Sequence, residues 1–168
     1  MKYKKMKILF IHGLESTLNK NKREILEEYG EVIAPILDYK NNSNIYNLLS
    51  NQIIDEKIDI IIGSSLGGFM GYHLSENFNK PSLLFNPALP YRSVNQIINE
   101  KINPEKEVFK YIVLGRLDNI VKFEDNLDFL IKNTINYTNL EIKIINNLEH
   151  RIPLEIFKKE IRNFFVSI

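Results

Sequence analysis

The chain has 168 residues, of which 44% are hydrophobic and 26% are charged, and its formal net charge is +1. These values are typical of one soluble globular domain. They exclude a disordered tail protein and give no indication of a nucleic-acid partner. The apolar runs are far shorter than a membrane span, and the basic start lacks the long apolar stretch of a signal peptide. Because cysteine is absent, we expect a cytoplasmic protein without disulfides or thiolate metal sites.

Short apolar runs alternate with longer amphipathic stretches along the chain. The predicted strands are 7–12, 32–37, 58–63, 82–86, 109–115 and 140–146. Between them, apolar residues at three- and four-residue spacing predict helices at 18–29, 45–57, 65–78, 123–135 and 154–165. The longest connection without a strand, 87–108, is expected to contain a short helix at 94–101.

This alternation predicts a doubly wound α/β fold, with a mostly parallel sheet of about six strands and helices on both faces. Runs 7–12 and 58–63 are almost continuously apolar, as expected for central strands. A proline in 32–37 cannot donate to a ladder, so this strand suits one edge. The run 140–146 alternates apolar and charged residues and suits the other edge. No linker or repeat interrupts the chain, so residues 1–168 are expected to form a single domain.

The motif with the clearest chemistry is Gly-x-Ser-x-Gly, with Ser65 at its centre. It follows a predicted strand and opens a predicted helix, which is the context in which a nucleophilic serine projects from a sharp turn. Glycines on both sides, Gly63 and Gly67, keep the strand and the helix from blocking that turn. The N–H of Leu66 would then face the developing oxyanion. The alternative is a glycine-rich turn that cradles a phosphate, but the usual dinucleotide and Walker motifs are missing.

A second candidate element, His12-Gly13-Leu14, follows the first predicted strand. The first and third strands are expected to be neighbours whose connections leave toward opposite faces, so this element meets Ser65 at the switch point. The N–H of Leu14 is the candidate second oxyanion donor, with the N–H of Gly13 as the alternative. His12 is interpreted first as a structural brace of the turn, and it is also kept as a candidate for substrate contact.

A nucleophilic serine needs an orienting acid and a base. In this fold both follow the serine along the chain, first an Asp or Glu as the acid and then a His as the base. His12 precedes the serine, and His73 lies two turns along the same predicted helix, too far to reach the hydroxyl. His150, in the loop before the last helix, is therefore the candidate base. Asp118 is the one carboxylate in the loop after the fifth strand and is the candidate acid, with a helix cap or turn as its alternative role.

On these residues the chain resembles the α/β-hydrolase superfamily, and within it the small YqiA-like esterases, near the RBBP-type serine hydrolases. The resemblance is carried by His12-Gly13, Gly63-Ser64-Ser65-Leu66-Gly67-Gly68, Phe85-Asn86-Pro87-Ala88, the run from Asp118 to Phe123, and His150. It implies a minimal α/β-hydrolase domain that hydrolyses esters or thioesters, with Ser65, Asp118 and His150 as the triad. The chain is short for this superfamily and lacks room for a large lid. The chain departs from the family where Glu15-Ser16-Thr17 follows the leading His-Gly and where Arg151-Ile152 follows the candidate base.

The predicted function is that of a serine hydrolase that cleaves small carboxylic esters or thioesters through an acyl-enzyme, with no cofactor, metal, nucleic acid or membrane partner. The alternatives are a catalytically silent binding protein of the same fold, a nucleotide-binding domain, and a peptidase or acyltransferase with the same triad. Residues 88–107 are the candidate cover of an open cleft. Tyr91 and Arg92 in it are candidates for substrate contact, although ordinary surface positions are the favoured interpretation.

Overall fold

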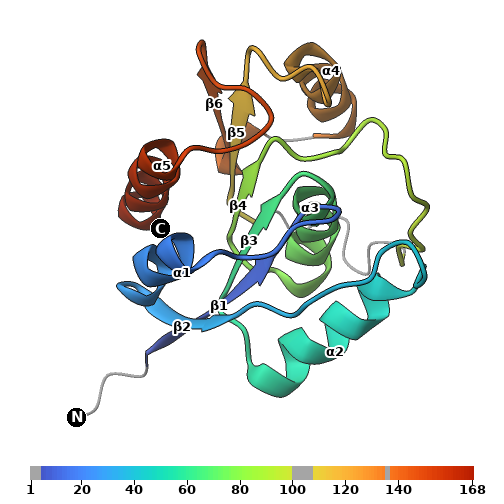
Figure 1. Ribbon diagram of the computed structural model, residues 1–168, viewed down its shortest axis with the longest axis vertical. Helices are drawn as coiled ribbons and strands as arrows, with labels where there is room; N and C mark the ends of the chain where they lie inside the picture. The colour runs from blue at the N-terminus through green and yellow to red at the C-terminus, as the bar shows by residue number, and fades with distance from the viewer. Residues whose placement is uncertain (1–4, 100–107, 135–136) are drawn as a thin grey trace.

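A computed structural model describes residues 5–99, 108–134 and 137–168 and places one sheet between two layers of helices (Figure 1). The strands are β1 (Met6–Ile11), β2 (Gly30–Ile33), β3 (Ile60–Ser64), β4 (Ser82–Phe85), β5 (Lys110–Gly115) and β6 (Leu140–Ile145). The helices are α1 (Lys20–Glu27), α2 (Ile45–Glu56), α3 (Leu66–Phe78), α4 (Phe123–Asn133) and α5 (Leu154–Ser167), with a 3-10 turn at Tyr137–Asn139. Within these ranges, no helix combines the length and apolarity that a membrane crossing needs.

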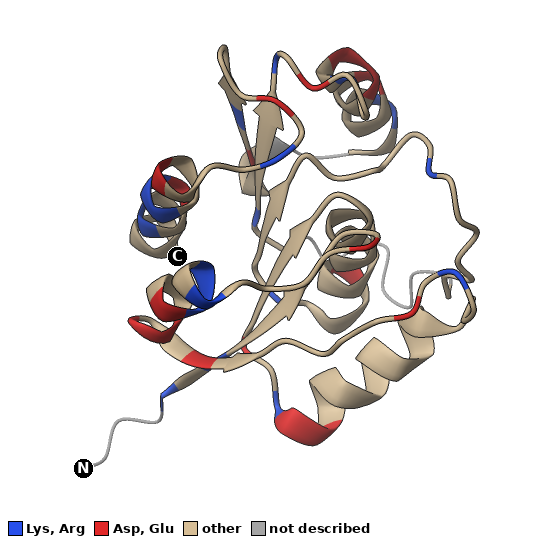
Figure 2. Cartoon of the chain, in the orientation of Figure 1, with Lys and Arg blue, Asp and Glu red and all other residues tan. Residues whose placement is uncertain are grey.

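The sheet has the order β2-β1-β3-β4-β5-β6, and every pairing in the described chain is parallel. This confirms the predicted doubly wound topology, the six strands and both edges. The inner strands β3 and β4 carry no charged residue and are almost entirely buried, as strands covered on both faces should be (Figure 2). The edge strand β6 alternates between partly buried and exposed residues, because one of its faces is more open to solvent.

The two faces of the sheet are covered by different helices. Ile25 of α1 and Phe157 of α5 pack with Ile8 of β1 in one apolar core. The other core joins α2, α3 and α4 to the opposite face of the sheet, where Leu9 of β1 lies. Alternate residues of β1 therefore enter different cores. Because β1 leads to α1 and β3 leads to α3, these neighbouring strands send the chain to opposite faces, and the switch point lies at their carboxyl ends (Figure 1).

The second strand is shorter and earlier than predicted. The sequence predicts a strand at 32–37, whereas β2 pairs with β1 only over Gly30–Ile33. Pro35 has no N–H to continue the ladder, and the N–H of Leu37 donates to the Nε2 atom of His12 (2.9 Å). β2 therefore ends before Pro35, which has no N–H, and before Leu37, whose N–H bonds to the side chain of His12.

The helix predicted at 94–101 is not formed by the part of it that the structure describes. The N–H of Ile97 donates to the carbonyl oxygen of Ser43 (2.9 Å), and the buried amide of Gln96 donates to two carbonyl oxygens of the loop before α2. These long-range bonds replace the local bonds of a helix and hold the segment against the loop before α2. The last two residues of the predicted helix, and residue 135 at the predicted end of α4, lie outside the described residues.

Candidate active site

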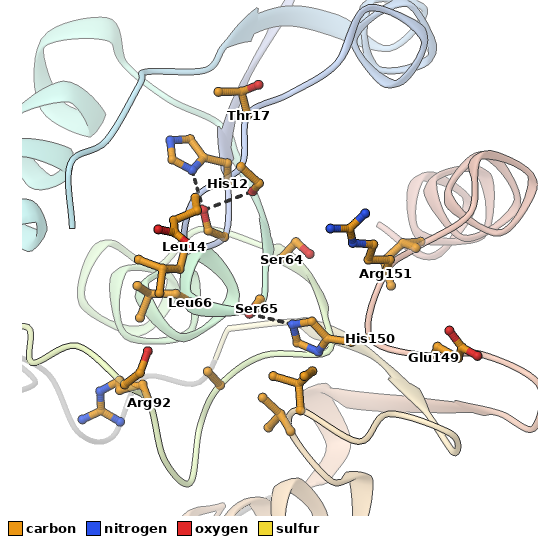
Figure 3. Close-up of a pocket in the computed structure, with 18 of the residues that line it drawn as sticks. His12, Leu14, Thr17, Ser64, Ser65, Leu66, Arg92, Glu149, His150 and Arg151 are labelled. Atoms are coloured by element: carbon orange, nitrogen blue, oxygen red, sulfur yellow. Dashed lines mark hydrogen bonds between the residues drawn. The ribbon is translucent and has the colours of Figure 1, made fainter. Parts of the chain in front are cut away.

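A cleft of about 1150 Å³ lies at the switch point of the sheet. The predicted functional residues that line it come from four loops that are far apart in sequence, and they include His12, Leu14, Ser65, Tyr91 and His150. Figure 3 shows Ser65 near the middle of these residues, with His150 on one side and Leu14 and Leu66 on the other. Parallel strands place all their carboxyl ends at one edge, which is why these loops meet here.

Ser65 forms the sharp turn between β3 and α3. Its backbone has φ 55° and ψ −119°, a conformation that a residue with a side chain rarely adopts and that is strained. Three backbone hydrogen bonds hold it there: its N–H donates to the carbonyl of Phe85 (2.9 Å), and its carbonyl accepts from the N–H groups of Phe69 and Ala88 (both 3.0 Å). The first turn of α3 and the end of β4 therefore stabilise the strained residue.

The glycines of the motif allow two backbones to approach closely at this turn. A Cβ atom on Gly67 would lie 2.1 Å from the carbonyl oxygen of Ile11, and one on Gly63 would lie 2.4 Å from the carbonyl oxygen of Gly67. Both distances are too short for a side chain, and both clashing groups are backbone. The start of α3 can therefore pack against β1 only because these positions are glycine.

The structure brings Ser65, His150 and Asp118 together in one hydrogen-bonded chain. The Oγ atom of Ser65 lies 2.9 Å from Nε2 of His150 (Figure 3). Nδ1 of His150 lies 2.7 Å from Oδ2 of Asp118. An ionised carboxylate can only accept, so we assign the imidazole proton to Nδ1, which leaves Nε2 to accept from the serine hydroxyl. This is the arrangement that a general base for a serine nucleophile requires.

The carboxylate of Asp118 is itself held in place. Its side chain is fully buried, and its Oδ1 atom accepts from the N–H groups of Ile120 (2.8 Å) and Val121 (2.9 Å). The turn role that the sequence offered as an alternative is therefore real, and it coexists with the bond to His150. One oxygen caps the turn before α4, and the other orients the imidazole.

Asn86 connects the acid and base loops, a role that the sequence does not predict. Its Nδ2 atom donates to the carbonyl oxygens of Glu149 (2.9 Å) and His150 (3.1 Å), and its Oδ1 accepts from the N–H of Gly115 (2.7 Å). Asn86 is buried and adopts φ 40°. The sequence carried one signal for it, the Asn-Pro-Ala run directly after a strand, which entered only as part of the family resemblance.

The candidate oxyanion donors lie on the side of Ser65 away from His150 (Figure 3). Leu66 is the first residue of α3, so its N–H has no partner within the helix. In the described part of the chain, no hydrogen bond uses the N–H of Leu66, Leu14 or Gly13. A Cβ atom on Gly13 would lie 3.1 Å from Cβ of Ser65, which places that loop directly against the serine.

His12 braces the turn after β1, the role that the sequence favours for it. The Nε2 atom accepts from the N–H of Leu37 (2.9 Å), so Nδ1 carries the proton and donates to the carbonyl of Gly13 (2.7 Å). The carbonyl of His12 also accepts from the hydroxyl of Tyr39 (2.8 Å), and the residue is only 5% exposed. Both ring nitrogens are used inside the protein, so the predicted polar contact of His12 with substrate is not supported.

The described part of the predicted cover, residues 88–99, forms one wall of the cleft. Tyr91 lines the cleft, and its hydroxyl accepts from the N–H of Lys122 (3.2 Å). The guanidinium of Arg92 lies over the ring of Phe69, 3.7 Å from its centre. This wall contains no helix, and residues 100–107 of the predicted cover lie outside the described residues.

The sheet order, the elbow at Ser65 and the switch-point cleft together define a protein with the α/β-hydrolase fold. Residues 7–126 match a family described as Uncharacterised protein family (UPF0227), and the chain belongs to that family. The predicted membership of the α/β-hydrolase superfamily, with likeness to the YqiA-like group, is thereby confirmed. In the described ranges, no three His, Cys, Asp or Glu residues lie where they could hold a metal ion.

Solved structures with the same fold cover nearly the whole chain. The monoacylglycerol lipase of Paleococcus ferrophilus is 14% identical, with a TM-score of 0.74, over 96% of this chain and 94% of that chain. The Bacillus cereus carboxylesterase is 14% identical, with a TM-score of 0.65, over 98% and 89%. Est1E of Butyrivibrio proteoclasticus, with ferulic acid bound, is 16% identical, with a TM-score of 0.71, over 98% and 89%. At these identities the likeness establishes a shared fold.

Proposed function

We propose that this protein is a serine hydrolase that cleaves carboxylic esters or thioesters through an acyl-enzyme. The observation that carries the proposal is the hydrogen-bonded chain from Ser65 through His150 to Asp118, with the serine on a strained turn. The lipase and the esterases that share this fold support the reaction class. The proposal includes Leu66 and Leu14 as oxyanion donors, with Gly13 as the alternative to Leu14.

In the first half of the reaction, Oγ of Ser65 attacks the carbonyl carbon while Nε2 of His150 takes the hydroxyl proton. Asp118 stabilises the resulting imidazolium through Nδ1. The tetrahedral oxyanion forms on the side of the N–H groups of Leu66 and Leu14, where a lost donor typically costs about 10²- to 10³-fold in rate. Collapse of the intermediate breaks the ester or thioester bond, and the leaving alcohol or thiol takes the proton from His150.

In the second half, water attacks the acyl group on Ser65. His150 takes a proton from the water and returns it to Oγ as the second tetrahedral intermediate collapses, which releases the carboxylic acid. The described walls leave the cleft open at its mouth, where Tyr91 is 44% exposed and Ile120 is 58% exposed. This favours small or extended soluble esters over acyl chains that need complete enclosure.

The test is labelling with a fluorophosphonate probe together with hydrolysis of 4-nitrophenyl butyrate. We expect wild type to be labelled and active, Ser65→Ala to lose both, and His150→Ala to be labelled much more slowly. Ser64→Ala is the matched control, because it removes a neighbouring hydroxyl and leaves the bond between Ser65 and His150. If folded wild type is neither labelled nor active, the proposal is wrong and a silent binding protein becomes the better assignment.

A further inference from the structure

The two walls of the cleft differ in charge and polarity. The wall formed by the loops after β4 and β5 combines apolar residues, among them Ala88, Val94, Ile120 and Val121, with Arg92, Ser93 and Asn119. The wall formed by the start of α1 and the loop before α5 is polar, and Figure 2 shows Lys or Arg residues in both places. The lining residues on that side that carry positive charge are Lys22 and Arg151.

Lys22 is a half-buried cation without an acidic partner. Its Nζ atom lies 5.1 Å from the centre of the Phe157 ring, so the side chain crosses from α1 to the first turn of α5. Among the described residues, no carboxylate forms an ion pair with it. Burial lowers the pKa of Lys22, because the charged ammonium has lost part of its water. An aromatic ring compensates only part of that loss.

Arg151, in the loop before α5, adds a second cation to the same wall. Figure 3 shows its guanidinium turned toward the cleft and the carboxylate of the nearby Glu149 turned away. No ion pair uses Arg151 in the part of the chain that the structure describes. The remaining acid of the lining, Glu15, is already paired with Lys40. The positive charge of this wall is therefore not neutralised by the protein.

We propose that this wall is an anion subsite, so that the substrate is an ester or thioester that also carries a carboxylate or phosphate, held by Lys22 and Arg151. The proposal rests on the proposed function of Ser65 and deepens it. A substrate anion supplies the partner that Lys22 lacks, and it offers the planar guanidinium of Arg151 two acceptor oxygens. Arg92 lies on the opposite wall, where its guanidinium lies 3.7 Å from the centre of the Phe69 ring, closer than the 5.1 Å between Lys22 and the Phe157 ring.

The experiment compares anionic and neutral esters of matched size. One pair carries the charge on the acyl group: 4-nitrophenyl hemiglutarate and 4-nitrophenyl valerate. The other carries it on the leaving group: 4-acetoxybenzoate and 4-acetoxybenzamide, with 4-acetoxyphenyl phosphate as the phosphate counterpart. The pair that shows the preference tells which part of the substrate reaches the subsite. Both pairs are measured with wild type, Lys22→Met, Arg151→Gln and the double variant.

We expect wild type to prefer the anionic member of one pair by about tenfold or more in kcat/KM, as a charge-assisted contact provides. Each single variant loses most of that preference through KM, the double variant loses all of it, and kcat/KM for the neutral ester falls by much less than for the anionic ester. Lys20→Met and Arg162→Gln, which remove cations outside the cleft, keep the preference. No preference in either pair, or a preference that survives in the double variant, overturns the proposal.

A binding measurement separates this proposal from the proposed function. We expect 4-hydroxybenzoate or 4-hydroxyphenyl phosphate to shift the NMR signals of wild type more strongly than 4-hydroxybenzamide, and to have no such effect on the double variant. If Ser65 is not labelled but this difference is present, the hydrolase assignment fails and the anion subsite stands. If Ser65 is labelled and neither binding nor turnover distinguishes the anions, the subsite is wrong and the hydrolase assignment stands.

Discussion

The nucleophile and the acid–base pair of this site are built in different ways. The nucleophile half, Gly63 to Gly68, is one continuous segment, in which a strained serine lies between small neighbours and backbone bonds to Phe85 and Ala88 hold the turn. The acid–base half joins Asp118 and His150 across two loops, and it is held by the buried amide of Asn86. A continuous motif can be recognised from the chain alone, whereas an assembled one depends on bonds between distant segments.

The largest effect is expected in the acid–base half. Asp118→Asn should lower kcat by about 10³- to 10⁴-fold with little change in the fold, because an amide no longer imposes the Nδ1–H tautomer on His150. The measurement is kcat for 4-nitrophenyl butyrate, with thermal unfolding as the check on folding. Asp128→Asn, an exposed aspartate of α4, is the control and should keep wild-type kcat. A kcat for Asp118→Asn within tenfold of wild type would show that Asp118 does not orient the base.

In the nucleophile half, the expected loss is of stability. Gly67→Ala should lower the free energy of unfolding by about 3 kcal/mol or more, because its Cβ would meet the carbonyl oxygen of Ile11 at 2.1 Å. Urea unfolding of the purified variant measures this, and failure to obtain folded protein agrees with it. Gly71→Ala in the same helix is the control, since its Cβ would meet only side-chain atoms of Leu84 and Ile61. Equal stability of the two variants would contradict the backbone argument.

Substitution of Asn86 tests whether the hydrogen bonds of its amide position the acid–base half. Asn86→Ala should lower kcat by about 10- to 100-fold at unchanged KM, because the loop of His150 loses its two bonds to the amide. The rate of fluorophosphonate labelling should fall by the same factor. Asn86→Asp should not rescue it, since a carboxylate cannot donate to the carbonyls of Glu149 and His150. Loss of stability with a normal labelling rate in the folded fraction would assign Asn86 a purely structural role.

The smallest effect concerns the helix behind the nucleophile. Burial lowers the pKa of His73 from 6.5 to about 4, against the opposing charge of Glu76 and with help from Arg92 and Lys110. The folded state then binds fewer protons than the unfolded chain, so stability present above pH 6.5 is lost as the pH falls toward 4. Between pH 7.5 and pH 5 the contribution is about 2 kcal/mol.

The measurement for His73 is urea unfolding at pH 7.5 and pH 5. Wild type should lose more stability than His73→Gln between these two values, and the difference isolates His73 from other groups that titrate. Identical losses in both proteins would show that His73 is not held neutral by burial.

What the sequence determined by itself was local or periodic. The apolar runs predicted the six strands, and their alternation with helices predicted a doubly wound sheet with the second and sixth strands at its edges, because parallel strands with right-handed crossovers allow few topologies. The Gly-x-Ser-x-Gly motif predicted the sharp turn at Ser65 from adjacent residues. Asp118 and His150 could be selected because they lie in the loops that follow β5 and β6, and the topology sends both loops to the edge of the sheet where Ser65 lies.

Only the tertiary structure decided the roles that depend on partners from elsewhere in the chain. The strand predicted at 32–37 ends early because the N–H of Leu37 bonds to His12, and the helix predicted at 94–101 gives way to bonds with the loop before α2. The bridging role of Asn86 likewise depends on bonds to Gly115, Glu149 and His150, which lie more than 20 positions away. The ring that Lys22 contacts, that of Phe157, is also distant in sequence. Local patterns describe what a segment prefers, whereas hydrogen bonding and burial between distant segments determine which preference is kept.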